Sequence, residues 1–258
     1  MLPAHSQDHH RIRLEWGATG ARELTAYAVG QGDVVAVVVD VLSFTTCVSV
    51  ALDAGTAVHP YRWNDASAEA FAAERGAVLA LPRQQAGPGD VSLSPASLRA
   101  ASGIGEVVLP SPNGSTVSAL LEGAGATVVA ASLRNASAVG DWLAATAEGA
   151  TVVVVPAGER WPDGSLRPAV EDLWGAGAVV DAVASAMREP TGLCSPEAEV
   201  ARVAFRHVAA GLDAALAACA SGRELIEKGY PQDVSIAAEL GWSDAVPVLR
   251  DGVFVRAG

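Results

Sequence analysis

The sequence predicts a single α/β domain of three layers, with helices on both faces of a mainly parallel or mixed central sheet. The first observation is residues 33–40, a Val-rich run apolar on both faces, as in a central parallel strand covered by helices. The second is the alternation of such runs with Ala-rich helical stretches, which is typical of βαβ units. The third is the length of 258 residues, enough for one substantial core. We expect residues 1–10 to form a flexible N-terminus and residues 11–258 to form the domain.

The predicted strands and helices alternate along most of the chain. After the strand at 33–40, apolar runs predict further strands at 77–81, 107–109, 127–130 and 151–155. Between them, helical patterns occupy residues 45–53, 65–74, 115–121 and 135–147. A long loop at 156–168, interrupted by Gly and Pro, then leads into a helix predicted at 169–188. Loops of that length inside a compact domain are often functional.

The C-terminal part is predicted to contain helices and a final hairpin. Residues 195–196 (Ser-Pro) indicate the start of one helix, and residues 221–224 have the spacing of a capping box for another, which residues 229–231 should end. Two apolar runs within 246–255 flank Asp251-Gly252, a dipeptide typical of tight hairpin turns. We expect this hairpin to close an edge of the sheet.

The charge of the chain restricts its partners. A formal net charge of −12, without a run of basic residues, argues against nucleic acid as a partner. An anionic small molecule can still bind where a metal ion or a few Arg side chains offset the field locally. The three cysteines lack Cys-x-x-Cys spacing, which indicates neither a zinc site nor a disulfide framework and favours a cytoplasmic location. No apolar stretch of transmembrane length occurs, so no membrane association is expected, and a homodimer is permitted but not required.

Polar residues follow the predicted strands at the points where each strand ends. Because ligands of open α/β sheets bind outside the carboxyl ends of the strands, these residues are candidates for binding a phosphate. Backbone N–H groups at a helix start favour such an anion, although for the segment around Asn113 taken alone an ordinary Asn-Gly turn with a Ser N-cap is the better explanation. The candidate phosphate-binding residues are Thr45, Thr46, Asn113, Gly114, Ser115, Ser132, Asn135 and Gly158.

Asp40 ends an otherwise apolar strand, where a buried carboxylate is costly unless it meets a cation, N–H donors or a metal. The alternative is that Asp40 caps the following helix, and both roles can hold at once. Glu171 and Asp172 fall in the first turn of a predicted helix, where acids also complement the helix dipole. If the three carboxylates converge, they suit a hard divalent ion such as Mg²⁺.

Four segments at these strand ends resemble the 2-phosphosulfolactate phosphatase family. The family's Asp-x-Leu-Arg-Ala-Thr segment is matched by residues 40–46, with Ser43 in place of the Arg, and its Thr-Asn-Gly-Thr turn by residues 112–115. Its Gly-Ser-x-x-Asn-x-x-Ala-Val segment is matched by residues 131–139, and its Ala-Gly loop followed by Glu-Asp by residues 157–158 and 171–172. The family's Gly-Glu-Arg segment is matched only at Arg83.

The resemblance implies a cytoplasmic α/β enzyme that uses Mg²⁺ to hydrolyse a phosphomonoester on a small anionic metabolite. In this hypothesis Asp40, with Glu171 or Asp172, binds Mg²⁺, the candidate residues above bind the phosphate, and Arg83, Arg134 or Arg160 neutralises developing charge. Three alternatives remain open. They are a phosphatase for a nucleotide or sugar phosphate, a non-catalytic protein that binds a phosphorylated metabolite, and a dimerisation domain.

Overall fold

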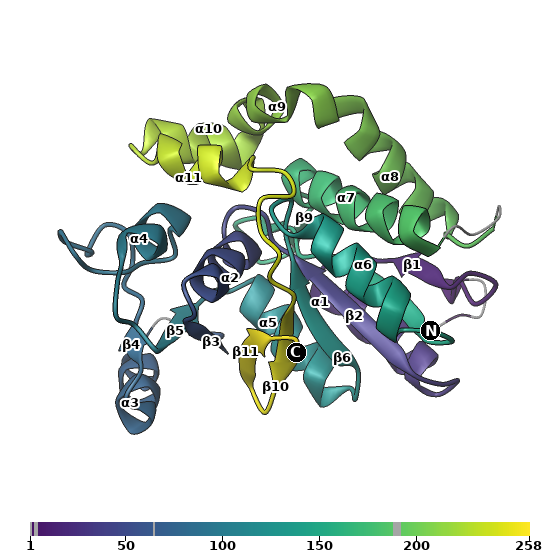
Figure 1. The fold of residues 1–258 in the computed structure, drawn as a ribbon, viewed down its shortest axis with the longest axis horizontal. Coiled ribbons are helices and arrows are strands. Elements are labelled where there is room, and N and C mark those ends of the chain that lie inside the picture. Colours follow the sequence, from purple (N-terminus) through teal and green to yellow (C-terminus); the bar gives the residue numbers. More distant parts are fainter. Residues whose placement is uncertain (1, 3–4, 64, 188–191) are drawn as a thin grey trace.

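The computed structural model describes residues 2, 5–63, 65–187 and 192–258, and it confirms the predicted fold class. A nine-stranded mixed sheet has the order β1-β7-β2-β6-β10-β11-β3-β5-β4, with helices on both faces (Figure 1). Strand β2 (Val34–Val39), an interior strand, separates two apolar cores, because successive side chains of a strand point to opposite faces. Val35, Val37 and Val39 lie in the core shared with α6 and α7, and the alternate residues lie in the core shared with α1, α2 and α5.

The sheet consists of two parallel blocks joined by the C-terminal hairpin. One block contains β1 (Ile12–Leu14), β7 (Thr151–Pro156), β2 and β6 (Thr127–Ala131), and the other contains β3 (Ala57–Tyr61), β5 (Glu106–Pro110) and β4 (Val78–Leu79). Strands β10 (Pro247–Arg250) and β11 (Val253–Arg256) pair antiparallel with each other, and also with β6 and β3 respectively.

The hairpin itself is confirmed, but its expected place at a sheet edge is wrong. It lies inside the sheet, between β6 and β3, where Val248, Leu249 and Phe254 are buried (Figure 1). A turn signal such as Asp251-Gly252 fixes the pairing of two neighbouring strands but carries no information about what pairs with their outer sides.

The helices that cover the sheet agree closely with the predicted ranges. The observed helices are α1 (Gly17–Val29), α2 (Phe44–Asp53), α3 (Ala66–Arg75), α4 (Pro95–Ala100), α5 (Gly114–Gly123), α6 (Ala136–Thr146) and α7 (Val170–Met187). Residue 188, the predicted end of the last of these, lies outside the described residues. Several elements had not been predicted, among them β1, α1, β3 and α4. The long loop also contains a small hairpin, β8 (Glu159–Arg160) and β9 (Leu166–Arg167).

The C-terminal helices form an arch that begins against α7 and ends beside α4 (green to yellow in Figure 1). They are α8 (Pro196–Val208), a 3₁₀ turn (Ala209–Gly211), α9 (Leu212–Ala218), α10 (Ala220–Glu227) and α11 (Pro231–Ala237). Ser195 caps α8 as predicted, because its side chain accepts a hydrogen bond from Ala198 N. The predicted capping box is wrong. Cys219 occupies the N-cap of α10, and Ser221 lies within the first turn.

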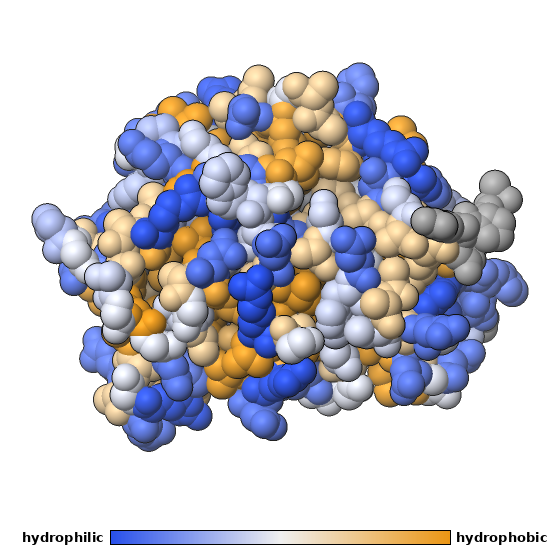
Figure 2. Space-filling view, viewed as in Figure 1, coloured by the Kyte–Doolittle hydropathy of each residue, from blue (hydrophilic) through white to orange (hydrophobic). Residues whose placement is uncertain are grey.

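On the face drawn in Figure 2, hydrophilic and hydrophobic residues are interspersed. Within the described ranges, no single helix is long and apolar enough to cross a membrane. One bent pair of helices, Pro196–Ala218 with Ala220–Glu227, is long and apolar enough to do so, by length and composition only.

Candidate active site

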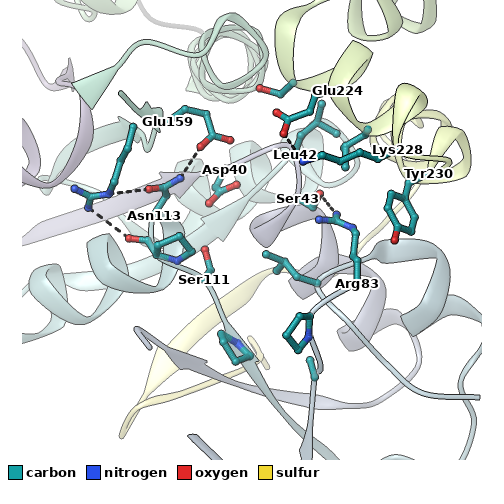
Figure 3. A pocket seen from close by; sticks show the side chains of 18 of the residues that line it. Asp40, Leu42, Ser43, Arg83, Ser111, Asn113, Glu159, Glu224, Lys228 and Tyr230 are labelled. Atoms are coloured by element: carbon teal, nitrogen blue, oxygen red, sulfur yellow. Dashed lines mark hydrogen bonds and ion pairs between the residues drawn. The ribbon is translucent and has the colours of Figure 1, made fainter. Parts of the chain in front are cut away.

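A cavity of about 590 Å³ opens beyond the carboxyl ends of β2 and β5 (Figure 3). Its walls come from the segments after these strands, the loop at 80–84, the β8–β9 hairpin and the C-terminal arch. Five cationic side chains line it, out of 17 Lys and Arg residues in a chain with a net charge of −12: Arg62, Arg83, Arg160, Arg167 and Lys228. Three acidic residues, Asp40, Glu159 and Glu224, also line the cavity, and Glu224 pairs with Lys228. The cations still outnumber the acids here, although the chain as a whole is acidic, which favours an anionic ligand.

Asp40 follows the last residue of β2 and lies at the floor of the cavity, 7% exposed. Its two carboxylate oxygens accept backbone hydrogen bonds from Phe44 N at 3.2 Å and from Gly114 N at 2.9 Å. The pKa of Asp40 is raised from 3.8 to about 6, chiefly by burial and in part by the charge of Glu171, while the two N–H donors act in the opposite direction. Asp40 therefore caps α2 and also lines the site, so both readings of this residue are compatible with the geometry.

Gly114 allows the close approach of α5 to Asp40. A Cβ at this position would lie 2.8 Å from Asp40 Oδ2 and 2.8 Å from Phe44 Cγ, closer than real side chains tolerate. The backbone N–H at the start of α5 can therefore reach the carboxylate only because residue 114 has no side chain.

Glu159, on β8, brings a second perturbed carboxyl group to the cavity. Asn113 Nδ2 donates to Glu159 Oε2 at 3.0 Å, and Arg160 Nε donates to Asn113 Oδ1 at 3.2 Å (Figure 3). The pKa of Glu159 is raised from 4.5 to about 7, chiefly by burial and in part by the charges of Asp40 and Glu171. A carboxyl group with a pKa near neutrality can give or take a proton under physiological conditions.

Arg83 lies on the opposite wall of the cavity from Asn113. Its Nη2 donates to Ser43 Oγ at 2.7 Å, and its Nε donates to Asp233 Oδ2 at 3.1 Å. The guanidinium is thus held at two points, and it lines the cavity beside Lys228 and Tyr230 (Figure 3). In the described part of the chain, Arg62, Arg160 and Arg167 form no salt bridge with a carboxylate.

The acidic pair predicted to bind a metal lies just behind the cavity. Glu171 and Asp172 are both buried in the first turn of α7. The two oxygens of Asp172 accept hydrogen bonds from Val41 N at 2.7 Å and Gly158 N at 2.8 Å, which ties the ends of β2 and β7 to α7. Burial raises the pKa of Asp172 well above its usual range, and the charges of Asp40 and Glu171 add to this effect.

The chemistry of these donors fits a hard cation. Among the described residues, no group of three or more His, Cys, Asp or Glu side chains is arranged to hold a metal ion. Mg²⁺, however, commonly takes only one or two protein carboxylates and completes its shell with water and substrate phosphate. The charge of Glu171 raises the pKa of Asp40, so a cation between the two would relieve a repulsion that the structure already contains.

The other predicted phosphate-binding residues are buried and do not line the cavity. The hydroxyls of Thr45, Thr46 and Ser115 donate to the carbonyls of Asp40, Val41 and Leu109. These bonds hold the segments that follow β2 and β5 in place. Their hydroxyls thus support the cavity wall from behind.

Ser132, Asn135, Arg134 and Gly158 are also held away from the cavity. Asn135 Oδ1 accepts from Ser132 N, and its Nδ2 donates to Ala245 O, next to the C-terminal hairpin. Arg134 is buried, and its guanidinium donates to Ser49, Asp53 and Glu239. Gly158 has φ of +68° and donates its N–H to Asp172. The structure therefore brings Asp40, Asn113 and Arg83 together in the cavity. The polar groups of Ser132, Arg134, Asn135 and Gly158 instead bond to buried partners outside it.

Several lining residues were not singled out from the sequence. Glu159 follows the strand predicted at 151–155, and this position after a strand end is the signal that could have identified it as a site residue. Arg62, Arg167, Lys228 and Tyr230 come from loops and from the C-terminal arch, where no local pattern marks them. Lys228 is the single lysine of the sequence, but composition alone gives no reason to place it in a site.

A family model described as 2-phosphosulpholactate phosphatase matches residues 22–252 of the 258, which include every residue that lines the cavity. A search of the curated proteins found no match to the chain.

Proposed function

The chain belongs to the 2-phosphosulpholactate phosphatase family, which makes it a phosphoric monoester hydrolase, and we propose that it hydrolyses the phosphate of a small anionic metabolite such as 2-phosphosulpholactate with Mg²⁺ as cofactor. The observation that carries the proposal is the cavity itself. Five cationic side chains face a buried carboxylate, Asp40, at the carboxyl ends of parallel strands. Such a combination of positive walls and an acidic floor suits a phosphate ester and a metal ion together.

The anionic parts of the substrate would be bound by the walls of the cavity. Asn113 and Arg160 form one wall through their mutual hydrogen bond, and Arg83 and Lys228 form another. An Arg that already has fixed partners can meet an oxyanion without first being ordered. The two walls therefore provide separate contacts for the phosphate and for a second anionic group of the substrate.

Proton transfer would fall to Glu159. In its neutral form, which a pKa of about 7 makes available near neutrality, it can protonate the leaving oxygen of the ester. Asp40 has the lower pKa of the two, about 6, and so carries the negative charge more of the time at neutral pH. This division of two carboxyl groups by their surroundings is how a site provides an acid and an anion at the same pH.

Asp40 and Glu171 are the residues that would hold Mg²⁺, with Asp172 orienting the backbone around them. When bound, Mg²⁺ would offset the charge of the phosphate oxygens and of the two carboxylates. The contribution of the protein is to exclude water around Asp40 and to fix the position of its carboxylate through Phe44 N and Gly114 N.

A second candidate is a phosphatase for a larger ester, such as a sugar phosphate. The specific observation is the cavity volume of about 590 Å³, which falls in the range of roughly 300–1,000 Å³ typical of sites for drug-sized ligands. Leu42, Leu93 and Leu225 also line the cavity and give it an apolar part that a three-carbon acid would leave empty.

The experiment is phosphate release from a panel of 2-phosphosulpholactate, phospholactate, sugar phosphates and nucleoside monophosphates, with and without Mg²⁺. We expect release that requires Mg²⁺ and is lost in Asp40→Asn but kept in Asp141→Asn, which changes an exposed Asp on α6. Full activity in Asp40→Asn would remove this residue from the mechanism, and release without Mg²⁺ would remove the cofactor. If no compound of the panel releases phosphate, the protein would instead be one that binds a phosphorylated metabolite without hydrolysing it.

A further inference from the structure

Asp233, in the first turn of α11, is a carboxylate that no sequence motif singled out. Its side chain is 1% exposed, and it does not itself line the cavity. Its Oδ2 accepts from Arg83 Nε at 3.1 Å, and its Oδ1 accepts from Ser94 Oγ at 2.5 Å and from Ala96 N at 3.2 Å. Every oxygen of this buried group thus has a donor, and one of the donors is a cation of the cavity wall.

Arg83 is oriented by this contact. With Nε on Asp233 and Nη2 on Ser43, the plane of the guanidinium is set by two partners that lie on different elements, α11 and the start of α2. Its Nη1 donates to no protein group in the described part of the chain, while the side chain is 18% exposed and lines the cavity. The free edge of the guanidinium is therefore the part available to a ligand.

A fixed guanidinium differs chemically from a free one. A long Arg side chain on a loop loses much rotamer freedom when it binds an anion, and a partner that orders it beforehand removes this cost from binding. The guanidinium also presents its donors in a rigid fork, so its orientation decides whether it meets an oxyanion with one bond or two. The 150 residues that separate Arg83 from Asp233 show that the fold, not the local chain, provides this orientation.

We infer that Asp233 is a positioning residue, which holds the Arg83 guanidinium in the orientation that binds an anionic group of the substrate. The inference rests on the proposed function, since it concerns the affinity of the same cavity. A purely structural role is the competing explanation, because Asp233 also ties α11 to the segment 94–96. The two explanations differ in what happens to substrate affinity when Arg83 is absent.

A double-mutant cycle on kcat/KM separates them. Asp233→Asn should raise KM about tenfold with little change in kcat, because an anion contact present in both the bound substrate and the transition state is weakened. Arg83→Ala should raise KM at least as much, and adding Asp233→Asn to it should have almost no further effect. Independent, multiplying effects, or an unchanged KM in Asp233→Asn, would overturn the inference. If Asp233→Asn folds poorly, Asp233→Glu is the second variant to measure. It keeps the negative charge but displaces it, and it should also raise KM.

Asp53 offers a matched control. Like Asp233, it accepts from an Arg nitrogen at 3.1 Å and from a Ser hydroxyl, here Arg134 and Ser243, but the pair lies outside the cavity lining. Asp53→Asn also removes an Arg–Asp ion pair, one in which the Asp is more exposed and the Arg keeps Glu239 as a second partner, so we expect a smaller loss of stability with KM unchanged. A KM that rises equally in Asp53→Asn and Asp233→Asn would mean that both act through general stability and would also overturn the inference.

A measurement without turnover keeps this test separate from that of the proposed function. In ¹⁵N NMR spectra of the full chain, the Arg83 Nε–H signal, assigned by its loss in Arg83→Ala, should be protected from solvent exchange in the wild type and in Asp53→Asn. It should also shift on titration with inorganic phosphate. In Asp233→Asn we expect both the protection and the shift to be lost. If the protein hydrolyses no ester but this result is obtained, the positioning role stands while the proposed function fails, and a protected, shifting signal in Asp233→Asn refutes the role.

Discussion

Replacing Glu159 with Gln should stabilise the folded protein at alkaline pH and leave its stability nearly unchanged at acidic pH. In the fold, the pKa of Glu159 is about 7, raised chiefly by burial, against 4.5 for the ordinary group. Between these two values the folded state binds more protons than the unfolded chain, so the free energy of unfolding falls as the pH rises from about 4.5 to about 7. Gln carries no charge and can still accept the hydrogen bond from Asn113 Nδ2.

The magnitude follows from the same pKa. A rise from 4.5 to about 7, at about 1.36 kcal/mol per pH unit, corresponds to about 3 kcal/mol of destabilisation once the group is ionised. Solvent that reaches the partly exposed side chain screens this, which leaves about 2 kcal/mol. Glu159→Gln should therefore raise the free energy of unfolding by about 2 kcal/mol at about pH 8.5 and by only a few tenths at about pH 4.

Urea unfolding of the wild type and Glu159→Gln at both pH values measures this difference directly. Glu69→Gln, which removes the same charge from an exposed position on α3, is the control and should give no pH-dependent gain. A gain of the same size at both pH values would refute the reasoning, because it would show that the charge of Glu159 is not what destabilises the fold. The variant should at the same time lose phosphatase activity, since the proposed acid is gone.

Three further outcomes are expected. Gly114→Ala should lower the free energy of unfolding by about 2 kcal/mol or more and impair catalysis, because the added Cβ would overlap the ring of Phe44. Gly123→Ala in the same helix is the control: its Cβ would have no atom within 4 Å, so thermal unfolding should show a neutral or slightly stabilising effect. Arg134→Met should cost about 3 kcal/mol in urea unfolding, because it leaves Asp53 without its cation and removes one of the two Arg partners of Glu239, and a change below about 1 kcal/mol would show that the pairs contribute little. Phe254→Ala should cost about 3–5 kcal/mol because this fully buried ring packs edge-on against Phe44 of α2 in one of the two cores, and an unchanged midpoint would argue against the interior position of the hairpin.

Much of the fold could be predicted because its signals are local. The Val-rich run at 33–40 became β2, and its alternating side chains enter two cores, as a strand covered on both faces requires. The elements that were missed lack such signals. Strand β1 has three residues, and α1 contains two glycines and only a few large apolar side chains.

The candidate site could be predicted only in part. Asp40 and Asn113 were identifiable because they follow strands, and parallel strands bring their carboxyl ends to one edge of a sheet. The same rule also selected Ser132 and Asn135, whose side chains the structure uses to hold buried backbone beside the C-terminal hairpin. Position at a strand end predicts proximity to the site but not the direction in which a side chain points.

The sequence by itself determined the class of fold and the acidic residue at the carboxyl end of β2, since these follow from periodicity and from the position of the strand end. Only the tertiary structure decided that the hairpin joins two parallel blocks, that Lys228 and Tyr230 face Asp40 across a cavity, and that Asp233 orients Arg83. The physical reason is that periodicity reports which side chains are buried. Periodicity does not report which buried residues contact each other, because those contacts depend on how elements far apart in the chain pack together.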